Sequence, residues 1–452
     1  MAKKPQSSIT RAELVSALSH ALDITEGQAE GHSVRCAWIG MAIGRQIGMS
    51  PPALGELYYT LLLKDIGCSS NAARICELYL ADDLQFKRDI KSVNDSLPQI
   101  LRFVLSHTGL KAGLSERFRS ILTIFSEGGE IARELIETRC QRGADIARRM
   151  RFSEDVAQGI LDLDEHWDGG GKPVGISGAD IALNARIALL AQVIDVFHTS
   201  GGKDVALKEV NRRSDSWFDP MLVASFEIIG EDDDFWAALS SDDLRCKVIS
   251  LAPEPVGEMV DEDYLDEIAA AFAEVVDSKS PYTAGHSDRV ALFADMIAEE
   301  LGLNPAKRRF LKRAALLHDL GKLGVSNQIL DKAGKLDEEE WQSVRQHPAQ
   351  SRTILSQIAA FEDLARVAGD HHERLDGKGY PCGIAGDAIC LETRIITAAD
   401  IFDALTAERP YRGPLPVSKA FEIMRGDIGT AIDGKCFAAL ERAMARLEQV
   451  AA

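Results

Sequence analysis

Two halves of the sequence resemble each other, and this repeat limits the folds open to the chain more than any other feature. The segment GHSVRCAWIGMAIGRQIGMSPPALGELYYTLLLKDIG, from residue 31, aligns without a gap with GHSDRVALFADMIAEELGLNPAKRRFLKRAALLHDLG, from residue 285. A second block, DGGGKPVGISGADIALNARIALLAQVIDVF from residue 168, aligns with DGKGYPCGIAGDAICLETRIITAADIFDAL from residue 376. A repeat of this length indicates two copies of one domain.

Apolar residues recur at helical spacing in both copies, for example in RVALFADMIAEELGL and SKAFEIMRGDI, whereas alternating strand-like runs are few. The sequence therefore predicts an all-α fold. The offset between the copies falls from 254 residues in the first block to 208 in the second, so the first copy is longer by 46 residues. We expect this insertion to consist of extra helices within 72–138.

Three parts of the chain follow from the repeat, since 452 residues also exceed one ordinary core. We expect the first copy over 1–229 and the second over 261–452. The stretch GEDDDFWAALSSDDLRCKVISLAPEPVGEMV matches nothing in the repeat, is acidic and contains two prolines. We interpret 230–260 as an acidic connector between the domains.

Charge and composition exclude several classes of protein. A formal charge of −19 argues against a partner that is a DNA or RNA polymer, because phosphate backbones are bound by clustered Lys and Arg. No run of about 18 apolar residues predicts a membrane span, and the N-terminal MAKKPQSSITRAEL lacks the apolar core of a signal peptide. We expect a cytoplasmic protein. Eight cysteines without a CxxC pair favour neither disulfides nor a thiolate zinc site.

Five histidines of the second copy stand out by their polar neighbours. Any one alone could be an ordinary core histidine, but five together indicate a metal site. They are His286, His318, His347, His371 and His372. Imidazole beside carboxylate suits Fe, Mn or Zn. Asp319 could bridge two metals, and Lys322, at i+4 from His318, would share its helical face.

The same motifs resemble those of HD-GYP domains, a branch of the HD-superfamily metal-dependent phosphohydrolases that hydrolyses cyclic dinucleotides. The resemblance covers residues 285 to about 440 and rests on GHSDRV, HDLGKLGV, HPAQS, HHERLDGKGYP and AADIFDALTAERPYR, in the family's order. It implies tandem HD-superfamily helical domains with a catalytic second copy. It implies that the metal ligands are His286, His318, Asp319, His347, His371, His372 and Asp400.

The resemblance also implies roles around the metals. Asp319 and Lys322 would be catalytic, with Lys322 facing the phosphate. The residues near the substrate would be Lys322, Asp403, Arg409 and Arg412, although the two arginines could be solvated loop residues. Gly377 and Gly379 would permit a tight loop, which Tyr380 and Pro381 would shape.

Two divalent metals would suffice for the reaction, because together they can activate a water and stabilise the leaving oxygen. Some HD-GYP domains hold a third metal with a glutamate four residues before the first histidine, but Tyr282 stands there in this sequence. We therefore expect two metals per catalytic domain, Fe or Mn first, with Zn, Ni or Mg as alternatives.

The first copy has lost most of these groups. His286 and Asp319 are matched by His32 and Asp65, but the other ligand positions have changed. Lys64 stands at the position of His318, Arg139 at that of His347, Leu163 at that of His371, Asp164 at that of His372 and Gln192 at that of Asp400. Cys68 replaces Lys322. Lysine and arginine at ligand positions would repel a metal, so we expect the first copy to be catalytically dead and to serve regulation or dimerisation.

The function predicted first is hydrolysis of cyclic di-GMP to linear pGpG in bacterial second-messenger signalling, with the further step to GMP left open. One alternative keeps the chemistry and changes the substrate to 3',3'-cyclic GMP-AMP. Another is a cyclic-dinucleotide receptor without useful turnover, against which the complete ligand set argues. A homodimer is left open.

Overall fold

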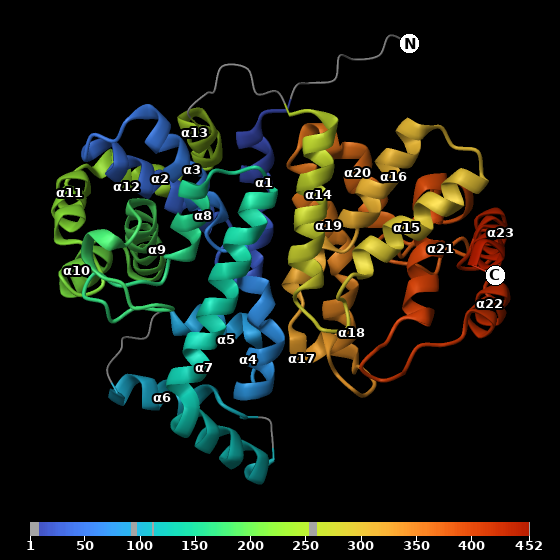
Figure 1. Ribbon diagram of the computed structural model, residues 1–452, viewed down its shortest axis with the longest axis horizontal. Helices are drawn as coiled ribbons and strands as arrows, with labels where there is room; N and C mark the ends of the chain where they lie inside the picture. Colours follow the sequence, from blue (N-terminus) through green and yellow to red (C-terminus); the bar gives the residue numbers. More distant parts are fainter. Residues whose placement is uncertain (1–8, 92–96, 111–112, 253–259, 452) are drawn as a thin grey trace. The chain divides into compact units, whose positions relative to one another are not determined.

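Helices make up nearly all of the regular structure of the protein (Figure 1). The computed structural model describes residues 9–91, 97–110, 113–252 and 260–451. Within these ranges there is no strand, and the isolated bridges link Ser214 to Phe218, Arg409 to Arg412 and Ile428 to Ile432. The prediction of an all-α fold is confirmed. Over the same ranges, no helix combines the length and apolar character needed to cross a membrane.

The chain divides into two compact units, Ser8–Val260 and Asp261–Ala452. The helices of the first unit are α1 (Arg11–Thr25), α2 (His32–Gln46), α3 (Pro51–Leu63), η1 (Cys68–Asn71), α4 (Ala72–Tyr79), α5 (Asp83–Ile90), α6 (Leu97–His107), α7 (Leu114–Arg149), α8 (Glu154–Leu161), η2 (Gly178–Asp180), α9 (Leu183–Gly201), α10 (Lys203–Arg213), α11 (Pro220–Gly230), α12 (Asp233–Leu239) and α13 (Leu244–Leu251).

The helices of the second unit are α14 (Glu262–Asp277), α15 (His286–Glu300), α16 (Pro305–Leu317), η3 (Leu320–Gly324), α17 (Asn327–Leu330), α18 (Glu338–Arg345), α19 (His347–Ser356), η4 (Ala359–Phe361), α20 (Glu362–Asp370), η5 (Gly386–Ala388), α21 (Leu391–Thr406), α22 (Val417–Gly426) and α23 (Gly434–Ala451).

The repeated sequence forms equivalent helices with equivalent ends. α2 and α15 each follow a glycine in the left-handed region, Gly31 with φ 80° and Gly285 with φ 66°, where a side chain would be strained. The next helices, α3 and α16, each have proline at the first position and are capped by the side chains of Ser50 and Asn304. The fold is therefore a tandem of two HD-type helical domains, as the sequence predicted.

Packing in the second unit brings several helix ends to one place. α15 packs against α16 and α21, and α19 packs against α20. Val290, Ala294 and Ile297 of α15 are buried in this core. The last residues of α16 and α20, the first residues of α15 and α19, and one face of α21 consequently meet in the interior.

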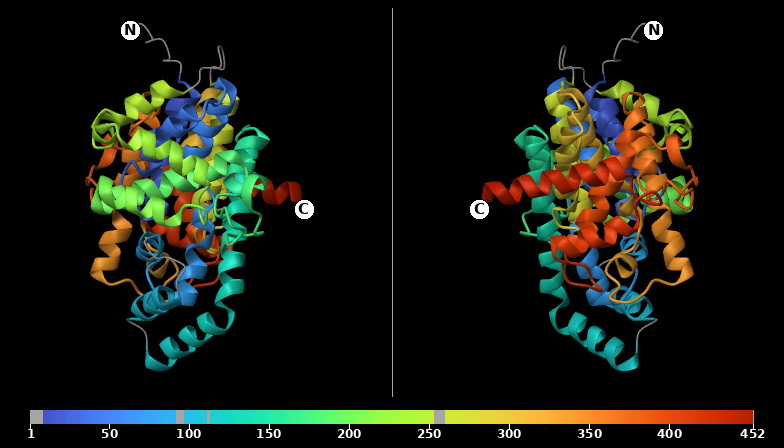
Figure 2. Two further views of the ribbon diagram at one scale, coloured as in Figure 1. Left: turned by 90° about the vertical axis from the view of Figure 1, so that its left-hand side faces the viewer. Right: turned by 90° about the vertical axis from the view of Figure 1, so that its right-hand side faces the viewer.

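The region of the predicted insertion, 72–138, contains α4, α5, α6 and the first part of α7. α7 continues beyond it to Arg149, and the residues from Arg139 onward occupy the position that α19 has in the second copy. Figure 2 shows the C-terminal part of α7 beside other helices of its unit and its N-terminal part bent away from them. α6 and the N-terminal part of α7 form the helical hairpin at its far end.

The segment predicted as a connector, 230–260, differs from a bare linker. It contains α12 and α13, of which α13 packs against α1 and α2. Its acidic residues are mostly exposed, but Phe235 and Trp236 are buried and form edge contacts with Phe226. These aromatic side chains attach the segment to the first unit, and residues 253–259 lie outside the described part of the chain.

Candidate metal centre

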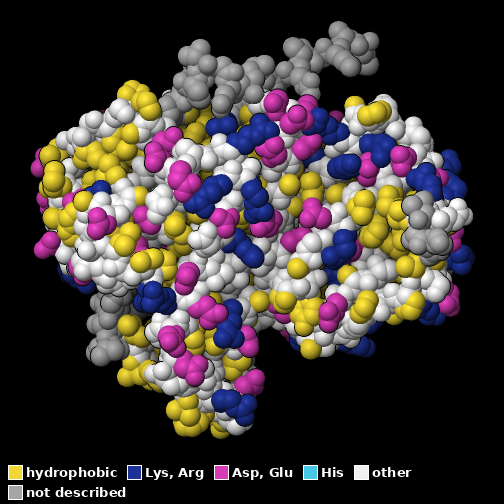
Figure 3. Space-filling model, viewed as in Figure 1, with side chains coloured by type: hydrophobic (Ala, Val, Ile, Leu, Met, Phe, Trp, Pro, Cys, Tyr) yellow, Lys and Arg dark blue, Asp and Glu magenta, His cyan; other side chains and the backbone are white. Residues whose placement is uncertain are grey.

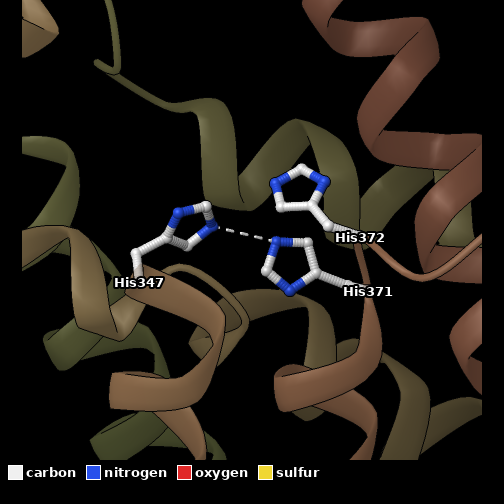
Figure 4. Close-up of side chains that lie close together, drawn as sticks. All are labelled: His347, His371 and His372. Atoms are coloured by element: carbon white, nitrogen blue, oxygen red, sulfur yellow. Dashed lines mark hydrogen bonds between the residues drawn. The ribbon is translucent and has the colours of Figure 1, made fainter. Parts of the chain in front are cut away.

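The predicted metal ligands of the second copy converge in the interior of its unit, and Figure 4 shows three of them. The helix ends place them: His286 and His347 begin α15 and α19, and His318 and His371 directly follow α16 and α20. Asp319 and His372 come next in the chain, and Asp400 lies in α21. Helix packing therefore brings together residues that are far apart in the sequence.

Asp319 is the residue around which the others gather. Its Oδ2 atom lies 3.2 Å from Nε2 of His286 and 3.2 Å from Nε2 of His318. Its Oδ1 atom lies 3.2 Å from Nε2 of His347 and 3.7 Å from Nε2 of His371. One carboxylate thus faces two sets of imidazole nitrogens from its two oxygens, as a bridging ligand would.

The remaining ligand candidates join these two sets. One group consists of His286, His318 and Asp400 and the other of His347, His371 and His372, and in each group the potential ligand atoms lie within 4.8 Å of one another. Tyr282, which replaces the glutamate of three-metal relatives, belongs to neither group. The arrangement offers two positions for cations, one on each side of Asp319.

Backbone contacts fix which ring nitrogen of each histidine faces the centre. The Nδ1 atoms lie against carbonyl oxygens, at 2.6 Å for His318 and Ala315, 2.7 Å for His347 and Val344, and 2.6 Å for His371 and Ala368. A carbonyl oxygen only accepts, so each Nδ1 carries the proton and each Nε2 presents a lone pair. This is the state in which a histidine binds a metal.

The candidate ligand atoms are well placed to bind cations, and several of them have no hydrogen-bond partner in the described part of the chain in the absence of a cation. Nε2 of His347 and Nε2 of His371 lie 3.2 Å apart (Figure 4), so two lone pairs face each other. Within the described residues, Nε2 of His286, Nε2 of His318 and Oδ1 of Asp319 are buried and have no hydrogen-bond partner. Buried polar atoms are normally paired, and a metal ion between these atoms would satisfy all of them.

The protonation states of the centre also suit metal binding. Burial lowers the pKa of His371 to about 3, and the nearby His318 and His347 contribute to the shift. Burial opposes ionisation of Asp319, but His318 and Lys322 hold its pKa well below the usual range. Burial alone would lower the pKa of His286, whereas the nearby carboxylates of Asp319 and Asp403 raise it to about 9, so His286 has to lose a proton before it can bind a metal. Ionised Asp319 and neutral His371 are the forms that ligate metals.

Asp403, predicted to lie near the substrate, lies behind His286 and bonds to it. Its Oδ2 atom accepts from Nδ1 of His286 at 2.7 Å, and its Oδ1 atom accepts from Nε of Arg289 at 2.5 Å. A carboxylate in this position fixes the orientation of a histidine ligand. The sequence reasoning missed Arg289, although the motif GHSDRV contains it at i+3 from His286.

The three cationic side chains predicted near the substrate, Lys322, Arg409 and Arg412, lie in different surroundings. Nζ of Lys322 donates to Oδ2 of Asp319 at 2.5 Å, but α16 ends before His318, so Lys322 lies in η3 and does not continue its helical face. Nη2 of Arg409 lies 3.9 Å from Asp403. The guanidinium of Arg412 donates to the carbonyl oxygens of Ala404, Leu405 and Gly413. Arg412 therefore caps the end of α21.

The loop that follows His372 is held close to the centre. Gly377 has φ 74°, and a Cβ on Gly379 would lie 2.4 Å from the backbone nitrogen of Arg374, so neither position suits a larger residue. The Tyr380 ring lies 4.9 Å from the His372 ring, and Pro381 follows through a cis peptide bond.

Glu373, which the sequence reasoning did not single out, holds the far end of this loop. Its Oε1 atom accepts from the backbone nitrogens of Cys382 at 2.6 Å and Gly383 at 3.1 Å. In the first copy, Oε1 of Glu165 accepts in the same way from Val174 at 2.7 Å and Gly175 at 3.1 Å. The loop has therefore kept its shape in a copy that has lost the ligands.

Lys64 occupies the centre of the first copy. Its Nζ atom donates to Oε1 of Gln192 at 3.0 Å, lies 3.1 Å from Nε2 of His32 and pairs with Asp65. In the repeat these partners match Asp400, His286 and Asp319 of the second copy. The ammonium group consequently lies among the counterparts of the first ligand group, where a metal would bind.

Arg139 fills the other side of the same centre. It matches His347, and its guanidinium pairs with Asp164, which matches His372, with Nε at 3.0 Å from Oδ2. Nδ1 of His32 remains bonded to Asp195 at 2.6 Å, and Asp195 pairs with Arg35. Burial and the charge of Lys64 lower the pKa of His32 to about 4. Internal cations therefore satisfy this centre without a metal.

Asp403 and Asp195 make equivalent contacts with a histidine in the two copies, so substituting each of them gives a matched test. We predict that Asp403→Asn weakens metal binding by the chain about 10- to 100-fold, because it removes the carboxylate that orients His286. Asp195→Asn changes the equivalent contact in the first copy and should leave metal affinity unaltered. Competition with a chelator measures both. Equal affinity of wild-type protein and Asp403→Asn would show that Asp403 has no part in holding the ligand.

Three comparisons with known proteins bear on this centre. A curated relative from Vibrio cholerae serotype O1, named 3'3'-cGAMP-specific phosphodiesterase 3, is 53% identical over 439 residues, which are 97% of this chain and 95% of the relative. A crystal structure described as a cyclic GMP-AMP specific phosphodiesterase of V. cholerae is 48% identical, covers 96% of this chain and 97% of its own, and superposes with a TM-score of 0.67. A cyclic di-GMP phosphodiesterase response regulator of Xanthomonas campestris pv. campestris is 35% identical over 46% of this chain and 56% of its own.

These relatives correct one prediction from the sequence. Cyclic di-GMP as the first substrate is wrong, because the relative that matches nearly the whole chain is named for 3'3'-cGAMP. The error has a physical origin: the metal-ligand motifs carry the hydrolysis common to both kinds of enzyme, and they contain no information about which bases are bound.

The family itself is established by several independent matches. The HD domain model matches residues 119–222 and 270–436, so it recognises part of each copy. The resemblance to HD-GYP domains and the prediction of a metal-dependent phosphodiesterase are confirmed. The chain belongs to the HD domain family.

Proposed function

We propose that the chain hydrolyses 3',3'-cyclic GMP-AMP, with the metal centre of the second unit as its active site. The observation that carries this proposal is the 53% identity to the 3'3'-cGAMP-specific relative over 97% of the chain. The convergence of all seven predicted ligands supports the location of the site. A receptor without turnover is less consistent with this complete set of ligands.

Two divalent metals per chain are the cofactors we propose. The first would bind His286, His318 and Asp400, the second would bind His347, His371 and His372, and Asp319 would bridge them. When bound, such a pair supplies an activated water and neutralises charge on the phosphoryl oxygens and the leaving oxygen. Five imidazoles favour Fe or Mn over Mg, whose preferred ligands are oxygens.

The side chains around the centre have separate tasks in this proposal. Lys322, beside Asp319 and 18% exposed, would turn its ammonium group to a phosphoryl oxygen when the substrate binds. Asp403 and Arg289 would orient His286, and the loop carrying Tyr380 would limit the space beside His372. Arg409 remains our candidate for a contact with the substrate, whereas Arg412 has its guanidinium on backbone carbonyls.

The first unit, in this proposal, is not catalytic. The cations of Lys64 and Arg139 lie at its former centre, and helix α5 adds Lys87, which donates to the carbonyl oxygen of Cys68 at 2.8 Å. We propose that this unit acts in regulation or association of the chain.

Substrate choice is tested by steady-state turnover of purified protein loaded with Mn or Fe. We expect kcat/KM for 3',3'-cyclic GMP-AMP to exceed that for cyclic di-GMP by at least about tenfold, because groups that hydrogen-bond one base reject another strongly. Equal or greater kcat/KM for cyclic di-GMP would refute the proposed substrate, while leaving the metal centre intact.

The location of the centre is tested by two matched substitutions of the repeat. Asp319→Ala should remove the bridge, lower the metal content from about two ions per chain and reduce turnover at least about 100-fold. Asp65→Ala should leave both quantities unchanged, because Lys64 and not a metal lies beside it. Metal analysis and turnover on the same preparations decide the matter, and an active, fully metallated Asp319→Ala would contradict the assignment.

A further inference from the structure

The α6–α7 hairpin carries a row of hydrophobic side chains on its surface. On α7, Leu114 is 85% exposed, Phe118 64%, Leu122 52% and Phe125 51%. Their spacing of four, four and three residues places them on one side of the helix. Ile124 and Ile131, on a different side, are buried and attach α7 to its unit. The row is therefore additional to the face that holds the hairpin in place.

Helix α6 enlarges the apolar surface of the hairpin through Ile100, Leu101 and Leu105, each about two-fifths exposed. Figure 3 shows hydrophobic side chains at the lower end of the molecule, where the hairpin lies. Seven such side chains expose on the order of 700 Å², since each loses roughly half of its surface or less to neighbours. Monomeric proteins rarely expose a contiguous apolar patch larger than about 600 Å².

We propose that this surface binds the same surface of a second copy of the chain, with the two α7 helices antiparallel. Two such surfaces, each with the row of α7 and the three side chains of α6, would together bury about 1,400 Å², which lies within the range of stable protein interfaces. The row is also compatible with self-association because its bulky residues, Phe118 and Phe125, lie near its two ends. When two rows pair in antiparallel directions with their Leu122 residues opposite each other, Phe118 of one copy lies near Phe125 of the other.

The overall charge of the hairpin argues against a membrane surface as the occupant. Residues 97–138 contain five Arg and Lys residues and five Glu residues, so the segment has no net charge. Helices that lie on anionic lipid surfaces are rich in Lys and Arg beside their apolar face. The mixed charges are suited to pairing with another helix of this chain.

Light scattering of the full-length protein after size-exclusion chromatography tests the proposal. We expect wild-type protein to have twice the chain mass of 49.3 kDa, and Leu122→Glu to shift the dissociation constant at least about 100-fold toward the monomer, because a carboxylate would be buried in the interface. Thr123→Glu adds the same charge one residue away on another side of α7 and should remain dimeric. Circular dichroism confirms that each variant is folded.

Two outcomes would overturn the proposal. Wild-type protein that is monomeric at about 10 μM would show that the row is unpaired or covered within the chain, and a dimeric Leu122→Glu would place the interface elsewhere.

Discussion

A buried aspartate directly after the third helix of each copy, Asp65 in the first and Asp319 in the second, requires a cation beside it. Removing an ionised carboxylate from water costs several kcal/mol unless a partner of opposite charge compensates. In the first copy the compensation is built into the chain, because Lys64 lies next to Asp65 in sequence and in space. In the second copy His318 holds the position of Lys64, and the ammonium group of Lys322 reaches only Oδ2 of Asp319. Oδ1 of Asp319 is buried without a hydrogen-bond partner among the residues that the structure describes, so cations from solution would complete the compensation on that side.

Contacts that both copies share are those that the helical fold requires, whereas side chains present only in the second copy are those that the metal chemistry requires. Both keep an aspartate bonded to a histidine and an arginine, as Asp195 is to His32 and Arg35, and both keep a glutamate that holds the glycine-rich loop. These contacts support the packing of α2 on α9 and of α15 on α21.

Sequence reasoning captured the fold, and it named the candidate ligands that the structure brings together, because both leave local signals. Helical periodicity predicted the helices, and HDLGK and HHERLDGKGYP identified side chains that helix ends bring together. Contacts across the chain left weaker signals. Asp403 was expected near the substrate because nothing local reveals that α15 brings His286 and Arg289 against it. Arg412 was expected to bind substrate, although its guanidinium caps α21.

Other features of the structure were not visible in the motifs, for physical reasons. The acidity of 230–260 suggested a connector, but a few buried aromatic residues outweigh exposed charges in deciding where such a segment packs. The position of Lys64 predicted repulsion of a metal, and only the structure shows that its ammonium group bonds to three counterparts of the ligands. Base preference is carried by groups that contact the bases, so it could not be read from motifs that bind metals.

Hydrogen exchange of the full-length protein, measured by mass spectrometry before and after chelation, tests the central claim most directly. If the second copy depends on cations from solution and the first on Lys64 and Arg139, chelation should speed exchange in peptides around His318–Asp319 and His371–His372, and restored metal should reverse the change. Peptides around Lys64–Asp65 should exchange at an unchanged rate. Equal loss of protection around both aspartates, or none around Asp319, would contradict this account.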